Sequence, residues 1–80
     1  MKSTSPRLRI TVDGQRLRKL RCQRYLTQEE LADMSGISAR TIQRMEAGGY
    51  FRFKTLLQVA SILGSDVSDF CRIEAPDLSS

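Results

Sequence analysis

The 80-residue sequence contains no histidine and no tryptophan. Histidine is the side chain that most often transfers protons near neutral pH, and no pair of carboxylates stands on a defined pocket to replace it. The two cysteines, Cys22 and Cys71, are too few and too far apart to form a metal cluster. We therefore expect that the protein is not an enzyme and uses no metal or cofactor, and the sequence indicates no small-molecule ligand.

Long apolar runs are also missing. No segment approaches the roughly 20 apolar residues that a membrane-spanning helix requires, and residues 1–10 lack the apolar stretch of a secretory signal. These absences predict a cytoplasmic protein without a membrane partner, in a compartment that keeps thiols reduced. Although one disulfide is formally possible, we expect Cys22 and Cys71 to be two small, half-buried thiols.

The chain is too short for more than one small domain. Aromatic residues are scarce, with three Phe and two Tyr, so the core must come mainly from Leu, Ile, Val and Met, an inventory that favours helices. The formal charge is +4, and the positive excess lies in residues 1–25, which hold eight Lys or Arg and one acidic residue. A basic domain suggests a polyanionic partner, although charge alone does not separate nucleic acid from a membrane surface.

Alternating side chains near the N-terminus predict a short strand. Leu8, Ile10 and Val12 alternate with polar residues, which is the period of a strand with one apolar face. No later segment reads as a second strand, so this one would lie on the helical core as an extended arm or pair with its own copy in another subunit. We assign residues 1–13 to this arm and residues 74–80 to a flexible tail.

Capping residues and apolar spacing predict helices in the rest of the chain. Thr27 and Glu30 have the spacing of a capping box, and Ser38 has the place of an N-cap. Gly36 and Gly64 are suited to the left-handed conformation that ends a helix. The predicted helices cover residues 14–24, 28–35, 39–47 and a fourth segment that ends at Gly64, with a short turn or helix at 67–70.

The connection between the second and third helices is the most informative feature. Only residues 36–38 separate their regular parts, and so short a connection forces the two helices to cross steeply. The small side chain of Ala32 lies where the backbones approach, while Ile42 and Met45 are spaced to fill the angle. This spacing is typical of a helix-turn-helix.

A longer pattern surrounds this connection, at Leu26 to Ala32, Gly36 to Ser38, Thr41, Ile42, Glu46, Gly48, Leu56, Leu57, Val59, Ala60, Leu63 and Gly64. In these positions the sequence resembles the Cro/C1-type helix-turn-helix family, also called XRE-like, which comprises bacterial and phage repressor domains. The resemblance covers about residues 14–70 and implies an all-α, compact bundle of about five helices of the lambda-repressor-like type, whose third helix enters the DNA major groove, often in a homodimer. We assign residues 14–73 to this helix-turn-helix domain.

The third helix carries the candidate DNA-reading residues. If Ile42 and Met45 face the core, the outward positions include two arginines and a glutamine, which can form paired hydrogen bonds with guanine and adenine, respectively. The predicted base-contacting residues are Ala39, Arg40, Gln43 and Arg44. The resemblance further implies contacts with the DNA backbone, which we assign to Thr27, Gln28, Ser38, Arg52 and Lys54.

Arg21 is a separate case, because it lies on the apolar side of the first helix, where an unpaired charge is costly. The resemblance implies that it pairs with a Glu near the end of the third helix, which is Glu46 in this sequence. We interpret Arg21 and Glu46 as a structural ion pair. The other basic residues of the first helix are expected to be mostly solvated.

Two local features depart from an ordinary helical domain. Tyr25 stands where the family often has Gly, so a positive φ there would cost roughly 1 kcal/mol. Tyr50, Phe51 and Phe53 cluster before the fourth helix. These aromatic side chains could pack in the core, stack on the sugar-phosphate backbone of DNA or form a contact between subunits. Core packing is expected for Phe53 and one other, and an exposed remainder would suit an interface between subunits.

Two functions from different classes are compatible with these residues. The first is a sequence-specific DNA-binding transcription regulator, a repressor, that acts on double-stranded DNA as a homodimer. The second is a protein-interaction module, such as an antitoxin or an adaptor, that uses the same fold. The dimer surface would be either the N-terminal strand or the loop 50–53 with the fourth helix, and we favour the second.

Overall fold

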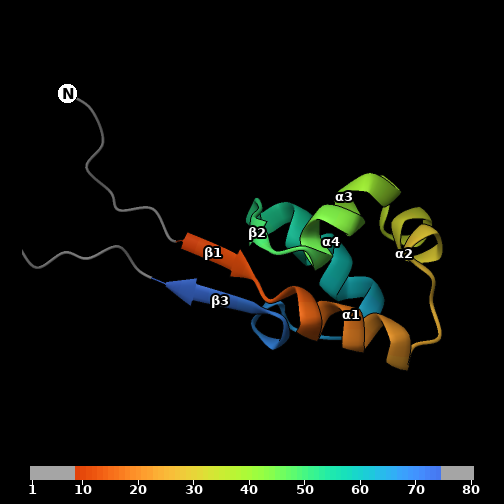
Figure 1. Cartoon of the computed structure of the whole chain (residues 1–80), viewed down its shortest axis with the longest axis horizontal. Coiled ribbons are helices and arrows are strands. Elements are labelled where there is room, and N and C mark those ends of the chain that lie inside the picture. Colours follow the sequence, from red (N-terminus) through yellow and green to blue (C-terminus); the bar gives the residue numbers. More distant parts are fainter. Residues whose placement is uncertain (1–8, 75–80) are drawn as a thin grey trace, which may run out of the picture.

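The computed structural model describes residues 9–74, which form four α-helices, one short 3-10 helix and a three-stranded sheet (Figure 1). The helices pack together, and the sheet extends from one end of them. In chain order the elements are β1 (Arg9–Val12), α1 (Gly14–Gln23), α2 (Gln28–Ser35), α3 (Ala39–Glu46), β2 (Gly49–Tyr50), α4 (Phe53–Leu63), the 3-10 helix η1 (Val67–Asp69) and β3 (Cys71–Glu74).

The helices begin and end where the capping residues predict. The Thr27 hydroxyl accepts a hydrogen bond from the Glu30 amide at 3.0 Å, and the Glu30 carboxylate accepts one from the Thr27 amide at 2.8 Å. Ser38 caps α3, while Gly36 and Gly64 end α2 and α4 with φ values of 73° and 65°. The predicted ends of α1 and α3 each extend one residue too far.

The sheet corrects the prediction that β1 has no partner within the chain. Its strand order is β2-β1-β3, and both pairings are antiparallel, with Val12 opposite Gly49 on one side and Cys71 on the other. β3 pairs with β1 along its whole length, and β2 pairs with it at Thr11 and Val12, so β1 has a partner on each edge within the chain and does not need a second copy to be paired.

The fold class therefore needs a correction as well. The protein is mostly helical rather than all-α, and the expected fifth helix is the three-residue η1. The sequence did not predict β2 and β3, because a strand of two residues is too short to show an alternating pattern and a strand of four residues shows it only weakly. Glu74, which was assigned to the tail, ends β3, while residues 1–8 of the predicted arm and residues 75–80 of the tail lie outside the described residues.

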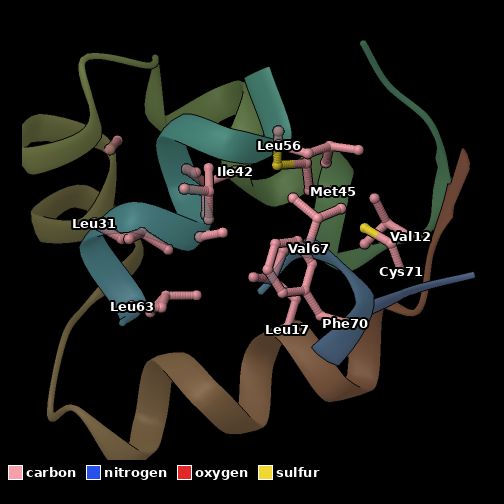
Figure 2. Close-up of a cluster of buried hydrophobic side chains, with 13 residues drawn as sticks. Val12, Leu17, Leu31, Ile42, Met45, Leu56, Leu63, Val67, Phe70 and Cys71 are labelled. Carbon is pink, nitrogen blue, oxygen red and sulfur yellow. The ribbon is translucent and has the colours of Figure 1, made fainter. Parts of the chain in front are cut away.

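The core lies between the four α-helices and η1 and extends to Val12 of β1 and Cys71 of β3 (Figure 2). Its largest fully buried side chain is Phe70, which closes the bundle from the C-terminal side. The other large side chains that are fully buried, less than 2% exposed, are aliphatic or Met: Leu17, Leu31, Ile42, Met45, Leu56, Val59 and Leu63.

Phe51 packs against this core, and Phe53 does not. Phe53 is 48% exposed, so its predicted burial is wrong. The reason is the start of α4. Arg52 is the N-cap residue and Phe53 is the first helical residue, which directs its side chain outward, while Phe51 lies in the preceding segment and packs partly against the core.

Tyr25 and the cysteines also differ in environment. Tyr25 has a φ of 59° and its side chain is 93% exposed, so it takes the left-handed conformation between α1 and α2 without any packing gain.

The two cysteines lie in different surroundings. Cys22 is exposed and Cys71 is buried, and both are free thiols rather than the two half-buried ones expected. Burial raises the pKa of the Cys71 thiol to about 11.

Candidate nucleic-acid interface

A tight turn holds α3 across α2. The left-handed Gly36 reverses the chain, and the Ile37 amide donates back to the Ala32 carbonyl at 3.0 Å. Ala32 is 4% exposed, and Ser35 donates its hydroxyl to the Leu31 carbonyl at 2.6 Å within the buried face of α2. The Ile37–Ala32 backbone bond and the burial of Ala32 and Ser35 hold α2 and α3 against each other at this joint.

The packing of α3 determines which of its residues can reach a ligand. Ile42 and Met45 are fully buried, and the opposite face of α3 is therefore turned to solvent. Ala39 is half-buried and packs against the core, so its outward reach is limited to a methyl group. The exposed residues of α3 are Arg40, Gln43 and Arg44, followed by the C-cap Ala47.

The N-terminus of α2 presents backbone amides beside this face. The first intrahelical bond runs from the Leu31 amide to the Thr27 carbonyl at 3.0 Å, and the Glu30 amide is taken by the Thr27 hydroxyl. The amides of Gln28 and Glu29 precede these bonds and therefore point out of the end of the helix. Free amides at a helix start favour a phosphate, although the acidic Glu29 and Glu30 weaken that attraction.

Three of the predicted backbone-contacting side chains already make hydrogen bonds within the protein. The hydroxyls of Thr27 and Ser38 cap α2 and α3, and Ser38 also shares a hydrogen bond of 2.9 Å with the Thr41 hydroxyl. The side chain of Gln28 is half-buried and donates from Nε2 to Oε1 of Glu46 at 3.0 Å. No sequence feature indicated this last contact, since it depends on how α2 and α3 cross.

Two exposed basic residues stand at the start of α4. Arg52 is the N-cap and makes no side-chain capping bond, and Lys54 lies in the first turn. Arg24 behaves differently from these two, because its guanidinium lies against Gly64 at the C-terminal end of α4, where a methyl group on Gly64 would overlap it. Arg52 and Lys54 are therefore available to a polyanion, whereas Arg24 is engaged with α4.

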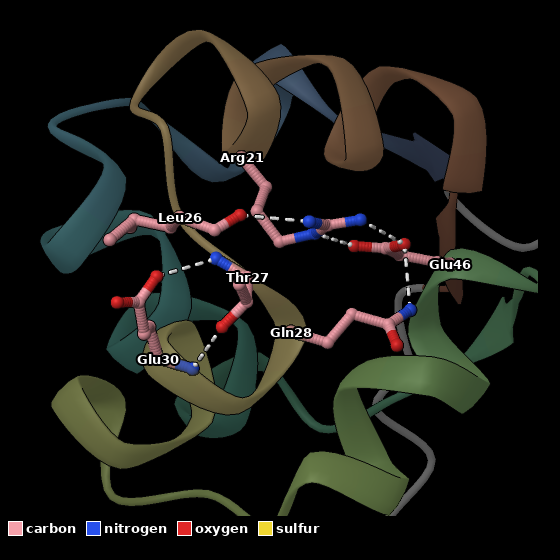
Figure 3. Close-up of polar contacts among 6 residues, drawn as sticks. All are labelled: Arg21, Leu26, Thr27, Gln28, Glu30 and Glu46. Atoms are coloured by element: carbon pink, nitrogen blue, oxygen red, sulfur yellow. Dashed lines mark hydrogen bonds and ion pairs between the residues drawn. The ribbon is translucent and has the colours of Figure 1, made fainter.

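The Arg21–Glu46 ion pair connects four parts of the chain (Figure 3). Arg21 donates from Nε to Oε2 of Glu46 at 2.6 Å and from Nη2 to Oε1 at 3.1 Å, while Nη1 donates to the Leu26 carbonyl at 2.8 Å. The two side chains are only 11% and 8% exposed. The hydrogen bond with Glu46 raises the pKa of Arg21 above its ordinary value, although burial opposes this shift.

A hollow of about 580 Å³ lies between α2 and the start of α3. Its lining includes Ser38 and Ala39 of the predicted interface together with the acidic residues Glu29, Glu30 and Asp33. These carboxylates repel phosphate, so the exposed basic face of α3 is the better candidate for contact with DNA.

Other kinds of site find no support in the described part of the chain. Across residues 9–74, His, Cys, Asp and Glu nowhere gather in a group of three or more that could hold a metal ion. In the same range, every helix is too short or too polar to cross a membrane.

Comparison with known proteins identifies the family. A helix-turn-helix family model matches residues 17–70, which is more than half of the chain. The protein therefore belongs to the helix-turn-helix family, in its Cro/C1-type, XRE-like form.

Two solved structures are similar to this one. The restriction-modification controller protein C.AhdI from Aeromonas hydrophila has 33% sequence identity and a TM-score of 0.66, over 70% of this chain and 86% of that one. The transcriptional regulator VanUg has 20% identity and a TM-score of 0.63, over 94% of this chain and 97% of that one, which shows the shared fold alone. A search of curated protein sequences gives no significant match.

Proposed function

We propose that the protein is a sequence-specific DNA-binding transcription regulator that represses by occupying its operator in the cytoplasm. The observation that carries this proposal is the outward face of α3, where Arg40, Gln43 and Arg44 are exposed beside one another. Arg and Gln are the side chains that recognise guanine and adenine in the major groove through paired hydrogen bonds. In helix-turn-helix proteins the second helix of the motif lies in the major groove, and in this chain that helix is α3.

Contacts with phosphates would place this ridge on the duplex. The amides at the start of α2, the hydroxyls of Thr27 and Ser38, and the amide of Gln28 flank α3 on one side. Arg52 and Lys54 stand at the start of α4, and both are exposed. Such contacts add affinity and fix orientation, but they carry no sequence information. Ala39, which is half-buried, would contribute a methyl contact at most.

The protein would act as a homodimer, because one recognition helix reads too few base pairs for useful specificity. Phe53 and Leu57 are 48% and 47% exposed and lie one turn apart on α4, and Tyr50 in β2 is 66% exposed. We refer to Phe53 and Leu57 as the α4 patch. Neighbouring exposed apolar side chains of this kind suit contact with a second copy. It lies close in sequence to Arg52 and Lys54, so a dimer through it would bring two basic surfaces to one duplex.

Selection of bound sequences from random duplex DNA tests the function. We expect enrichment of a two-fold symmetric sequence whose half-sites are about 10 base pairs apart, one helical turn. Binding should weaken steeply as the salt concentration rises, because phosphate contacts release counterions. If the folded protein retains no duplex DNA even at low salt, the function is wrong. A protein-interaction module that uses the same fold, such as an antitoxin or adaptor, would then be favoured.

A further inference from the structure

The carboxylate of Glu46 is shared by two partners on two helices (Figure 3). Arg21 of α1 donates to both of its oxygens, and Gln28 of α2 donates to Oε1, which therefore accepts from Nη2 of Arg21 at 3.1 Å and from Nε2 of Gln28 at 3.0 Å. Glu46 is the last residue of α3, and its side chain is 8% exposed. A carboxylate in this position cannot contact DNA itself, because it is nearly buried and negatively charged.

The same ion pair holds the start of α2 at two points. One is the Leu26 carbonyl, which accepts from Nη1 of Arg21 at 2.8 Å just before the helix begins. The other is Gln28, the first residue of α2, through Glu46. The start of α2, which would contact a phosphate, is therefore held against the end of α3, the helix that would contact the bases.

The Gln28 amide has two N–H groups and one oxygen. The N–H donated to Glu46 restricts rotation of the amide and leaves the second N–H for another acceptor. A glutamine that is free in solution must lose rotamer freedom before it can contact a phosphate, whereas one that is already held does not. The hydrogen bond to Glu46 thus prepares Gln28 for a contact on its remaining side.

We propose that Glu46 is a positioning residue for DNA binding, which acts by holding the side chain of Gln28 at the phosphate-facing start of α2. This inference rests on the proposed function, since it assigns a role within the same DNA interface. It goes beyond the structural ion pair, because a purely structural Glu46 would stabilise the fold without changing the DNA affinity of the folded protein.

A double-mutant cycle on operator DNA tests the coupling. The variants are Gln28→Ala, Glu46→Gln and the double variant, each measured as the dissociation constant of the correctly folded fraction, below its melting temperature. We expect each single change to weaken binding by about 3- to 10-fold, which is the range for one immobilised side chain. The double variant should bind DNA no more weakly than the single variant with the lower affinity, because Glu46 acts through Gln28.

Glu30→Gln provides a matched control. Glu30 is also a carboxylate in the first turn of α2, but its hydrogen bond is with the Thr27 amide, whereas Glu46 accepts from the Gln28 side chain. Glu30→Gln and Gln28→Ala should therefore act independently, so that the fold-change in affinity of the double variant is the product of the two single fold-changes. If the effects of Glu46→Gln and Gln28→Ala multiply in the same way, Glu46 does not act through Gln28 and the inference is overturned.

A measurement on the unaltered protein covers the case in which Glu46→Gln fails to fold. The side-chain amide protons of Gln28 can be followed by NMR in the free protein. We expect two well-separated signals, one of them shifted downfield and slow to exchange because it is donated to the carboxylate, and operator DNA should then shift mainly the other. Two signals at the positions of a solvent-exposed glutamine would contradict the inference.

The outcomes for the function and for the inference are distinct. If the unaltered protein binds no duplex DNA, the proposed function fails and the positioning role fails with it. If the unaltered protein binds a preferred sequence but the changes at positions 28 and 46 act independently, only the positioning role is wrong.

Discussion

The backbone of Gly14 lies directly against the backbone of Glu46, so closely that a methyl group on Gly14 would overlap the Glu46 carbonyl oxygen. Gly14 is the first residue of α1 and Glu46 is the last residue of α3. The close approach lets the end of α3 lie against the start of α1, about two helical turns from Arg21, which binds the Glu46 side chain.

Replacement of Gly14 by Ala should therefore destabilise the protein. Helix propensity alone predicts a gain in stability of up to about 1 kcal/mol. The overlap with backbone atoms of Glu46 should outweigh that gain and leave a net loss of about 1–3 kcal/mol. Chemical denaturation at 25 °C measures the net effect. An increase in stability would show that the two backbones are not in contact.

Gly36→Ala is the matched control for this change. A methyl group on Gly36 would meet nothing within 4 Å, and only its φ of 73° opposes a side chain. The expected loss is therefore about 1–2 kcal/mol, from the left-handed conformation alone. Since this glycine ends α2, the variant also reports whether the helix-turn-helix joint tolerates strain.

The second prediction concerns the ion pair. Arg21→Met would leave the Glu46 carboxylate, which is 8% exposed, with Gln28 as its remaining side-chain partner. The expected loss of stability is about 3–5 kcal/mol, because a buried charge without its counterion is poorly solvated. Replacement of both Arg21 and Glu46 by apolar residues should restore much of it. An unchanged thermal melt for Arg21→Met would contradict a buried pair.

The helices and their limits were predictable from the sequence because local chemistry defines them. Ser38 and Gly36, like the capping box at Thr27, act within one helical turn, and the structure places the helix ends within one residue of the prediction. The sheet was not predictable, since β2 has two residues and gains its stability only from pairing with β1. Isolated strands of that length leave no pattern in the sequence.

The candidate interface shows the same division between local and tertiary information. The exposure of Arg40 and Arg44 follows from the spacing of Ile42 and Met45 along one helix. The contact between Gln28 and Glu46 could not be predicted, because it requires the angle at which α2 and α3 cross.

The third prediction uses the raised pKa of Cys71. Its thiol has a pKa of about 11 in the folded protein against an ordinary value of 9.0, so the folded state holds this proton more tightly than the unfolded state. The contribution of the Cys71 thiol to the free energy of unfolding is therefore fully present below pH 9. It is lost as the pH rises toward 11, which lowers the free energy of unfolding by up to about 2–3 kcal/mol.

Comparison with Cys71→Ala isolates this effect from the tyrosines and lysines that titrate in the same range. The difference in the free energy of unfolding between the two proteins should shrink between pH 9 and pH 11. The unaltered protein loses the contribution of the Cys71 thiol in this range, whereas the variant has no thiol at this position to lose. A constant difference between the two proteins over this range would show that the thiol titrates normally.

The fourth prediction assigns the dimer surface to the α4 patch. Phe53→Lys places a charge in that patch and should raise the dissociation constant of the dimer by at least about 10-fold, because a charge in an apolar interface must be desolvated. Tyr25→Lys is the control, since Tyr25 is 93% exposed between α1 and α2. Sedimentation with and without operator DNA separates the two. Equal association of both variants would exclude the patch as the dimer contact.

The most direct test of the central claim compares α3 with the basic residues near α4 on two kinds of DNA. Arg40→Ala and Arg44→Ala should each weaken binding to the preferred sequence by about 1–3 kcal/mol while changing binding to random duplex far less. Arg52→Ala and Lys54→Ala should weaken both kinds of binding alike and reduce the dependence on salt. Equal losses on preferred and random DNA for Arg40→Ala and Arg44→Ala would contradict α3 as the helix that reads the sequence.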